Sequence, residues 1–161
     1  MELVKVDESK IDICSKFAKN IFINYYTNLI GEKQALYMAD LFLSNEAIKK
    51  LINKGAIFKI VYENNKPISY IEYIKENNKV FLSKLYVDSN YRNKGYGKYM
   101  LDDCINYAKN NNINTIYLTV NKYNTPSINI YKHLNFKIID AVVNDIGNNY
   151  VMDDYIMELS I

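Results

Sequence analysis

Cysteine, histidine, proline and glycine are scarce in this sequence, and each scarcity excludes a kind of structure. The 161 residues include 2 Cys and 1 His, too few for a disulfide-stapled domain or a four-ligand structural zinc site of Cys and His. Cys14 and Cys104 stand in no metal-binding spacing and fall on the apolar sides of expected helices, so we interpret them as reduced core residues. With 5 Gly and 2 Pro, the chain has no linker rich in either residue. We therefore expect one domain, residues 1–161.

Long apolar runs and a strong charge of one sign are also missing. No apolar segment approaches membrane-spanning length, and residues 1–10 lack the parts of a secretory signal, so we expect a cytoplasmic protein without a membrane partner. A net charge of +2 and an isoelectric point near 8.3 give no strong basic field. Nucleic acid is therefore not expected as a partner either, and a small molecule or a peptide is.

Hydrophobic periodicity predicts a mixed α/β (α+β) domain. Apolar residues repeat at helical spacing before Gly31 and at strand spacing after Ala56. The expected elements are a strand at 3–6, helices from 13 to 30, 33–43 and 45–54, strands at 57–63, 68–74 and 79–87, a helix from 97 to 109, a strand at 115–120, a helix at 125–134, and strands at 136–143 and 150–159.

Several finer expectations follow from these patterns. The strands from 57 to 87 should form an antiparallel meander, and the continuous apolar run 115–120 should be a buried parallel neighbour of 79–87. Phe81, Leu85 and Val87 should share one face of their strand. Thr125 should cap the following helix ahead of Pro126, with Ile130 and Leu134 facing the core, and NDIGNN at 144–149 should be a loop.

A short glycine-containing loop joins the strand 79–87 to the helix that follows it. Its residues are Arg92, Asn93, Lys94, Gly95, Tyr96, Gly97 and Lys98, here called the glycine loop. Glycines allow backbone amides to approach an anion closely, and a helix N-terminus adds its positive dipole. Tyr99 stands where a nucleoside-triphosphate loop needs Ser or Thr, and Met100 stands where a dinucleotide fingerprint needs its third glycine. The loop therefore predicts a phosphate site of another kind, with an ordinary turn as the alternative.

Arginine occurs once in this chain, at Arg92, although Lys and Arg together number 20. Only a guanidinium offers a rigid fork of donors to phosphate oxygens. The position of the one arginine beside Gly95 and Gly97 strengthens the prediction of a phosphate site.

Arg-x-x-Gly-x-Gly after a strand resembles the central motif of the GNAT family of N-acetyltransferases. The resemblance implies a mixed, mostly antiparallel central sheet of about seven strands with helices on both faces, and acetyl-coenzyme A (acetyl-CoA) as co-substrate, with no metal. It places the coenzyme's diphosphate on the glycine loop and its pantetheine arm along Leu85, Tyr86 and Val87. Asn124 matches the family's coenzyme-binding Asn, whereas Asn121 is interpreted as a turn residue.

The same resemblance implies roles in catalysis. Tyr131 matches the family's general acid, which protonates the departing thiolate, and Ser127, one turn earlier, lies on the same helix face. Phe81, Ser83 and Lys84 occupy positions where members that use a side-chain general base often carry a carboxylate or a histidine.

Glu72, on the neighbouring strand, is then the candidate base, acting through water, and a solvated strand carboxylate is its alternative role. His133 should lie on the far side of its helix from Tyr131.

The sequence therefore predicts an acetyl-CoA-dependent N-acetyltransferase that transfers an acetyl group directly to a primary amine in a ternary complex. The segments YMADLFLSNEAIKKLI and YVMDDYIMEL resemble those of small bacterial polyamine acetyltransferases, which implies an acceptor such as spermidine drawn by Glu72, Asp153 or Asp154. The alternatives are a non-catalytic acyl-CoA sensor, an interaction module, and an acetyltransferase for protein N-termini, lysines, amino acids or antibiotics. A homodimer is a further expectation from the family.

Overall fold

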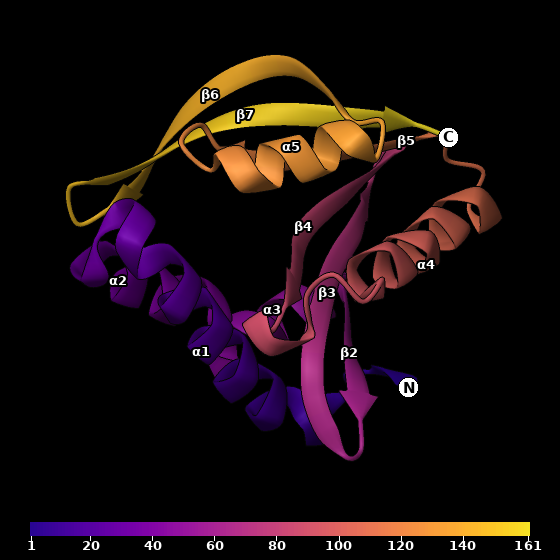
Figure 1. Ribbon diagram of the computed structural model, residues 1–161, viewed down its shortest axis with the longest axis horizontal. Coiled ribbons are helices and arrows are strands. Elements are labelled where there is room, and N and C mark those ends of the chain that lie inside the picture. The colour runs from indigo at the N-terminus through magenta and orange to yellow at the C-terminus, as the bar shows by residue number, and fades with distance from the viewer.

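Seven strands form one sheet in the order β1-β2-β3-β4-β5-β7-β6 (Figure 1). The computed structural model describes residues 1–161. Its strands are β1 Glu2–Lys5, β2 Ile57–Glu63, β3 Lys66–Glu76, β4 Lys79–Val87, β5 Thr115–Asn121, β6 Lys137–Gly147 and β7 Tyr150–Ser160. Its α-helices are α1 Ile11–Ile30, α2 Glu32–Leu43, α3 Asn45–Asn53, α4 Tyr96–Asn110 and α5 Thr125–His133, with single 3-10 turns at Glu8–Lys10 and Ser89–Tyr91.

Helices cover both faces of the sheet, as predicted. On one face, α1, α2 and α3 pack against β2 and β3 through side chains such as Cys14, Phe58 and Tyr70. On the other face, α4 and α5 pack against the same sheet through a second apolar cluster that includes Cys104 and Met157. Both cysteines are buried and unpaired, which confirms the interpretation of them as core residues. None of the helices is long and apolar enough to cross a membrane.

Strands β4 and β5 run parallel but pair only briefly. Their register is limited to Val80 with Ile116 and Phe81 with Tyr117, and all other neighbouring strands are antiparallel. Beyond this pairing the two strands separate, as Figure 1 shows. The predicted meander and parallel neighbour are both confirmed. The separation of β4 from β5, which no sequence pattern indicated, opens the centre of the sheet.

A β-bulge in β4 overturns one prediction about its faces. Glu72 of β3 pairs with Lys84, but the next residue, Tyr73, pairs with Leu82, so Ser83 is an extra residue in β4. The inserted residue shifts the side-chain alternation by one. Phe81 consequently faces α1 and α2, whereas Leu85 and Val87 pack with α4, so these three residues do not share a face.

Three further local predictions were wrong. The side chain of Asn124, rather than Thr125, caps α5 by accepting a hydrogen bond from the Ser127 N–H. Ile130 is 57 % exposed, and Ile128 takes the buried position on that helix. The expected loop at 144–149 is mostly strand, because β6 and β7 extend to a tight turn at Asn148 and Asn149, both with left-handed backbone.

Candidate active site

The glycine loop presents a run of free backbone amides. Asn93 and Gly95 have left-handed backbone, with φ of 61° and 86°, and α4 begins at Tyr96. None of the N–H groups of residues 93–98 donates a hydrogen bond within the protein. The first N–H groups of a helix always lack intrahelical partners, and here the preceding loop lengthens that set. The loop can therefore donate several hydrogen bonds to one anionic group.

Gly97 has an ordinary helical backbone, so conformation does not explain its lack of a side chain. A Cβ built on Gly97 would meet no protein atom within 4 Å. Packing within the protein therefore does not require glycine there, whereas the close approach of a ligand to the amides would. The residues present fit a diphosphate.

The positive side chains of the loop differ in how free they are. The guanidinium of Arg92 lies 5.4 Å from the centre of the Tyr25 ring, and its Nε donates to the carbonyl oxygen of Val87 at 3.3 Å. The Lys94 ammonium lies over Tyr91, whereas that of Lys98 forms an ion pair of 2.7 Å with Asp102. Arg92 and Lys94 therefore supply the unpaired positive charge beside the free amides.

Tyr25 of α1 joins this loop to the start of α5. Its hydroxyl donates to Oδ1 of Asn124 at 2.7 Å and lies 3.1 Å from the Ser127 hydroxyl. The Arg92 guanidinium lies over the ring of the same tyrosine. The structure thus brings together three predicted site residues, Arg92, Asn124 and Ser127, around one tyrosine that the sequence did not single out as functional.

The separated part of β4 leads from the glycine loop into the sheet. From Leu82 to Val87, β4 has β3 as its only strand partner, so its β5 side has no strand beside it, and there the Val87 carbonyl oxygen accepts from Arg92 Nε. Leu85, Tyr86 and Val87 lie in this stretch. An extended ligand with amide groups can pair with such an edge in the manner of an added strand.

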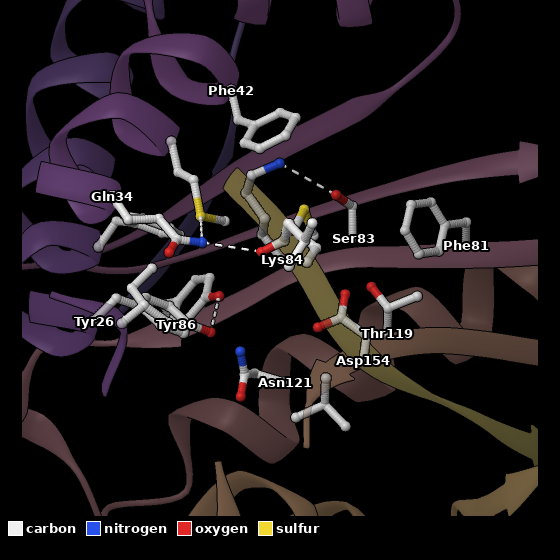
Figure 2. A pocket seen from close by; sticks show the side chains of 16 residues that line it. Tyr26, Gln34, Phe42, Phe81, Ser83, Lys84, Tyr86, Thr119, Asn121 and Asp154 are labelled. Atoms are coloured by element: carbon white, nitrogen blue, oxygen red, sulfur yellow. Dashed lines mark hydrogen bonds between the residues drawn. The ribbon is translucent and has the colours of Figure 1, made fainter. Parts of the chain in front are cut away.

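A pocket of about 240 Å³ opens at the bulge, between the helices α1 and α2 and the strands β4, β5 and β7. Figure 2 shows Ser83 and Lys84 of the bulge on one side of it and Asp154 with Thr119 and Asn121 on another. The hydroxyls of Tyr26 and Tyr86, 2.8 Å apart, form part of its lining. The free loop amides, the unpaired strand edge and the pocket together form a site for one long ligand and one small ligand.

The sequence pattern of the Acetyltransferase (GNAT) family matches residues 19–136, which is most of the chain and includes the glycine loop. The chain belongs to this family. As a family member it is an acetyltransferase, and the acetyl donor of these enzymes is acetyl-CoA. The free amides of the glycine loop and the unpaired edge of β4 are features of this acetyltransferase fold that suit such a donor.

Solved structures show the same fold. The PaiA N-acetyltransferase from Thermoplasma acidophilum, solved in complex with coenzyme A, superposes with a TM-score of 0.85 at 22% identity, over 99% of this chain and 98% of that one. A GNAT-family acetyltransferase from Staphylococcus aureus gives 0.75 at 23% identity, over 99% and 98%. A GCN5-related N-acetyltransferase from Rhodopseudomonas palustris gives 0.81 at 13% identity, over 99% and 95%. A search of curated protein sequences found no match to this chain.

Asp154 is the carboxylate that faces the pocket. Its residue is 4 % exposed, and its side chain makes no hydrogen bond or ion pair within the acetyltransferase. The adjacent Asp153 differs, because it forms an ion pair with Lys122 at 2.7 Å. Burial, reinforced by Asp153 and opposed by Lys122, raises the pKa of Asp154 from 3.8 to about 6. Asp154 is therefore largely ionised at neutral pH and able to accept a proton.

Glu72 does not lie where a solvated strand carboxylate would. It is 2 % exposed, forms an ion pair with Lys84, and is not among the residues that line the pocket, although Lys84 is. The alternative interpretation of Glu72 as a solvated residue was therefore wrong. The Lys84 ammonium also lies 3.2 Å from the Ser83 hydroxyl, so the pair holds both side chains of the bulge in place.

Tyr131 packs edge-on against Phe136, with ring centres 5.5 Å apart. Burial, with smaller effects of Tyr26 and Tyr25, raises the pKa of Tyr131 well above that of a free phenol. Its hydroxyl therefore keeps its proton at neutral pH. His133 is exposed, as predicted, and takes no part in the site.

Sequence reasoning missed the tyrosines of α1 and underrated Asp154. Neither Tyr25 nor Tyr26 was predicted to have a functional role. The only available signal was an adjacent pair of tyrosines near the end of a long helix. No group of three or more His, Cys, Asp or Glu residues is placed to hold a metal ion.

Proposed function

We propose that the protein transfers the acetyl group of acetyl-CoA to a primary amine, by direct attack of the amine within a ternary complex. Three features that follow one another along β4 and the glycine loop support this proposal. They are the free amides of residues 93–98, the strand edge without a strand partner at 82–87, and the pocket beside the bulge, which contains the unpaired carboxylate of Asp154. The glycine loop would hold the diphosphate, the β4 edge would pair with the pantetheine, and the pocket would receive the amine.

Direct transfer is favoured over an acetylated enzyme by the state of the two thiols. Cys14 and Cys104 are buried, and burial raises the pKa of each thiol to about 12. A protonated, inaccessible thiol is a poor nucleophile. The amine itself is then the nucleophile for the thioester.

The proton transfers assign roles to three side chains. The attacking amine must first lose a proton, and Asp154 in the pocket is the group that we propose accepts it, directly or through water. The amine nitrogen then bonds to the thioester carbon, and the carbon–sulfur bond breaks with its electron pair passing to the sulfur. Tyr131 would give its phenolic proton to the departing sulfur, and the second proton of the nitrogen would pass through water to the resulting phenolate, which restores Tyr131. Glu72, the base expected from the sequence, is buried in its pair with Lys84 and would act only by positioning that lysine.

Calorimetry and initial rates test this function. Acetyl-CoA should bind with one site per chain, and rates measured over a grid of acetyl-CoA and amine concentrations should give intersecting reciprocal plots, the pattern of a ternary complex. Parallel plots would show an acetylated intermediate instead. Binding of acetyl-CoA with no turnover of any amine would favour the second candidate, an acyl-CoA sensor.

The acceptor and location are narrower proposals. Spermidine, implied by the resemblance, protein N-termini or lysines, and aminoglycoside antibiotics are the acceptor classes to compare. The cytoplasm is the proposed location, because acetyl-CoA is made inside cells and unpaired buried thiols are typical of reducing compartments.

A further inference from the structure

The residues that line the pocket indicate the chemistry of the part of the acceptor that is attached to its amine group. Of its 16 lining residues, 10 are hydrophobic, and they form a wall that includes Phe22, Ile30, Met38, Phe42, Phe81 and Met152. These side chains come from α1, α2, β4 and β7, and two of them, Phe42 and Phe81, are labelled in Figure 2. An acceptor bound here must place an uncharged body against this wall.

Only one charge in the pocket is free. The charged residues that line it are Lys84 and Asp154. Lys84 is neutralised by its ion pair with the buried Glu72, whereas Asp154 has no partner. One carboxylate can compensate one ammonium, and a second ammonium would lie unpaired among apolar side chains, which costs several kcal/mol.

Contacts between α2 and the β6–β7 hairpin hold these two elements together beside the pocket. Gln34, which lines the pocket, donates to the carbonyl oxygen of Val151 at 3.0 Å, and the Tyr37 hydroxyl donates to that of Ile146 at 2.7 Å. Gly147 has a left-handed backbone, and a Cβ there would lie 2.8 Å from the Tyr37 hydroxyl, so glycine suits this close approach. These contacts hold the hairpin in place, and the pocket volume of about 240 Å³ has the size of a small molecule.

We infer that the acceptor is a small monoamine with an apolar body, an alkyl or aryl group of about five to eight carbons, and not a polyamine or a protein. Its ammonium lies at Asp154 before deprotonation, and its body lies against Phe42, Phe81 and the neighbouring side chains of the wall. This inference rests on the proposed transfer to an amine and narrows its substrate class.

A matched pair of acceptors tests the inference. Pentylamine and 1,5-diaminopentane have the same carbon chain and differ by one ammonium group. At saturating acetyl-CoA, kcat/KM measured by release of free thiol should be about tenfold or more higher for pentylamine, because the diamine must bury its second charge. 2-Phenylethylamine should also be a substrate, and spermidine should be poorer than either monoamine. Equal or higher kcat/KM for the diamine or spermidine would overturn the inference.

A variant pair controls for the charge itself. Met152 lines the pocket and lies two residues before Asp154 on the same face of β7, a spacing of about 7 Å along a strand. Met152→Glu should therefore raise kcat/KM for 1,5-diaminopentane by about tenfold, whereas Met152→Gln, of nearly the same shape without charge, should not. If both variants change the preference equally, the pocket does not select by charge.

The proposed acetyl transfer and the inferred class of acceptor are overturned by different results. If acetyl-CoA does not bind, or if no amine of any class is acetylated, the proposed function is wrong and the inference falls with it. If amines are acetylated but polyamines, aminoglycosides or protein N-termini are preferred, the inference alone is wrong. A thermal shift with pentylamine in the presence of coenzyme A, lost in Asp154→Asn, should report acceptor binding without turnover.

Discussion

The hydroxyl of Tyr25 donates a hydrogen bond of 2.7 Å to Oδ1 of Asn124, a residue 99 positions further along the chain. Asn124 is 3 % exposed and also caps α5 through the same oxygen. The tyrosine therefore fixes the orientation of the amide group, and neither of these two hydrogen bonds uses its NH₂. Because the Tyr25 ring also lies under Arg92, one side chain of α1 organises both ends of the proposed coenzyme site.

Tyr25→Phe should weaken acetyl-CoA binding by about fivefold, the scale of one hydrogen bond of about 1 kcal/mol. The ring remains to stack under Arg92, so the loss should come from the hydrogen bonds of the hydroxyl, chiefly the one to Asn124. Calorimetry with Tyr25→Phe, Asn124→Ala and the double variant checks this. The double variant should bind no more weakly than Asn124→Ala, and additive losses would show that Tyr25 does not act through Asn124.

Gly97→Ala should stabilise the folded protein and weaken its binding of acetyl-CoA. The protein has room for a Cβ at Gly97, and alanine is the better helix former by up to about 1 kcal/mol. The added methyl group should nevertheless block the approach of a phosphate to the loop amides, raising the Kd for acetyl-CoA by about tenfold or more. Urea unfolding and calorimetry measure the two effects. Unchanged affinity in a stable Gly97→Ala protein would remove the diphosphate from this loop.

Tyr131→Phe should lower kcat by roughly 100-fold while leaving acetyl-CoA affinity and folding intact, because only the proposed proton donor is lost and the packing on Phe136 remains. Single-turnover kinetics should show that the chemical step is the one slowed. An acetyl donor with a more acidic thiol should recover part of the rate in the variant. Equal single-turnover rates for variant and wild type would return Tyr131 to a packing role.

Asp154 should make the stability of the folded protein decrease as the pH rises from 4 to 7. Its folded pKa of about 6 exceeds the ordinary 3.8, so the folded protein binds this proton more tightly than the unfolded chain does. Stability from this group is therefore greatest below about pH 4 and falls as the pH rises to 6. At pH 7 the cost is on the order of 2 to 3 kcal/mol, and Asp154→Asn should unfold at a higher temperature than wild type. Thermal unfolding at pH 4 and pH 7 measures the difference.

The same carboxylate should control activity in the opposite sense. The kcat/KM of the wild type should fall about tenfold per pH unit below pH 6, as Asp154 becomes protonated and loses the ability to accept a proton. Asp154→Asn should be slow throughout and lack this limb of the profile. Asp153→Asn is the matched control, because it removes an ion pair with Lys122 and should not raise the melting temperature. A stabilised Asp154→Asn with full activity would exclude Asp154 as the base.

Glu72 and Lys84 allow a test of structural support against catalysis. Glu72→Gln should destabilise the protein by about 3 kcal/mol, because it leaves a buried lysine unpaired, and Glu72→Gln with Lys84→Met should recover most of that loss. If Glu72 only positions Lys84, the double variant should keep measurable turnover with a pH profile still governed by Asp154. Loss of the acidic limb in the double variant would instead identify Glu72 as the base.

Much of this site was readable from local patterns. Two strands, Ile57–Glu63 and Lys79–Val87, have the predicted bounds, because each combines β-branched and aromatic residues with clear turns on both sides. The glycine loop was found because Gly95 and Gly97 stand between a strand pattern and a helix pattern, close to Arg92, the one arginine. These features depend only on neighbours in the chain.

The predictions that were wrong or missed concern residues whose positions are set by pairing between segments distant in the sequence. Phe81 was assigned to the wrong face because a bulge arises from register with β3, and a period of two within one strand cannot reveal it. Asp153 and Asp154 must point to opposite sides of β7, but which of them meets Lys122 and which enters the pocket is decided by β5. The link from Tyr25 to Asn124 has the same origin in tertiary structure.

The short pairing of β4 with β5 gives the sheet an edge in its middle, besides those of β1 and β6. Unpaired strand edges are places where protein chains join and aggregate, and outer edges must be protected from this. An edge that faces a gap inside its own sheet can be reached by a single thin, extended molecule but not by the sheet of another protein. The opening that suits a ligand of that shape therefore also shields the chain from association through this strand.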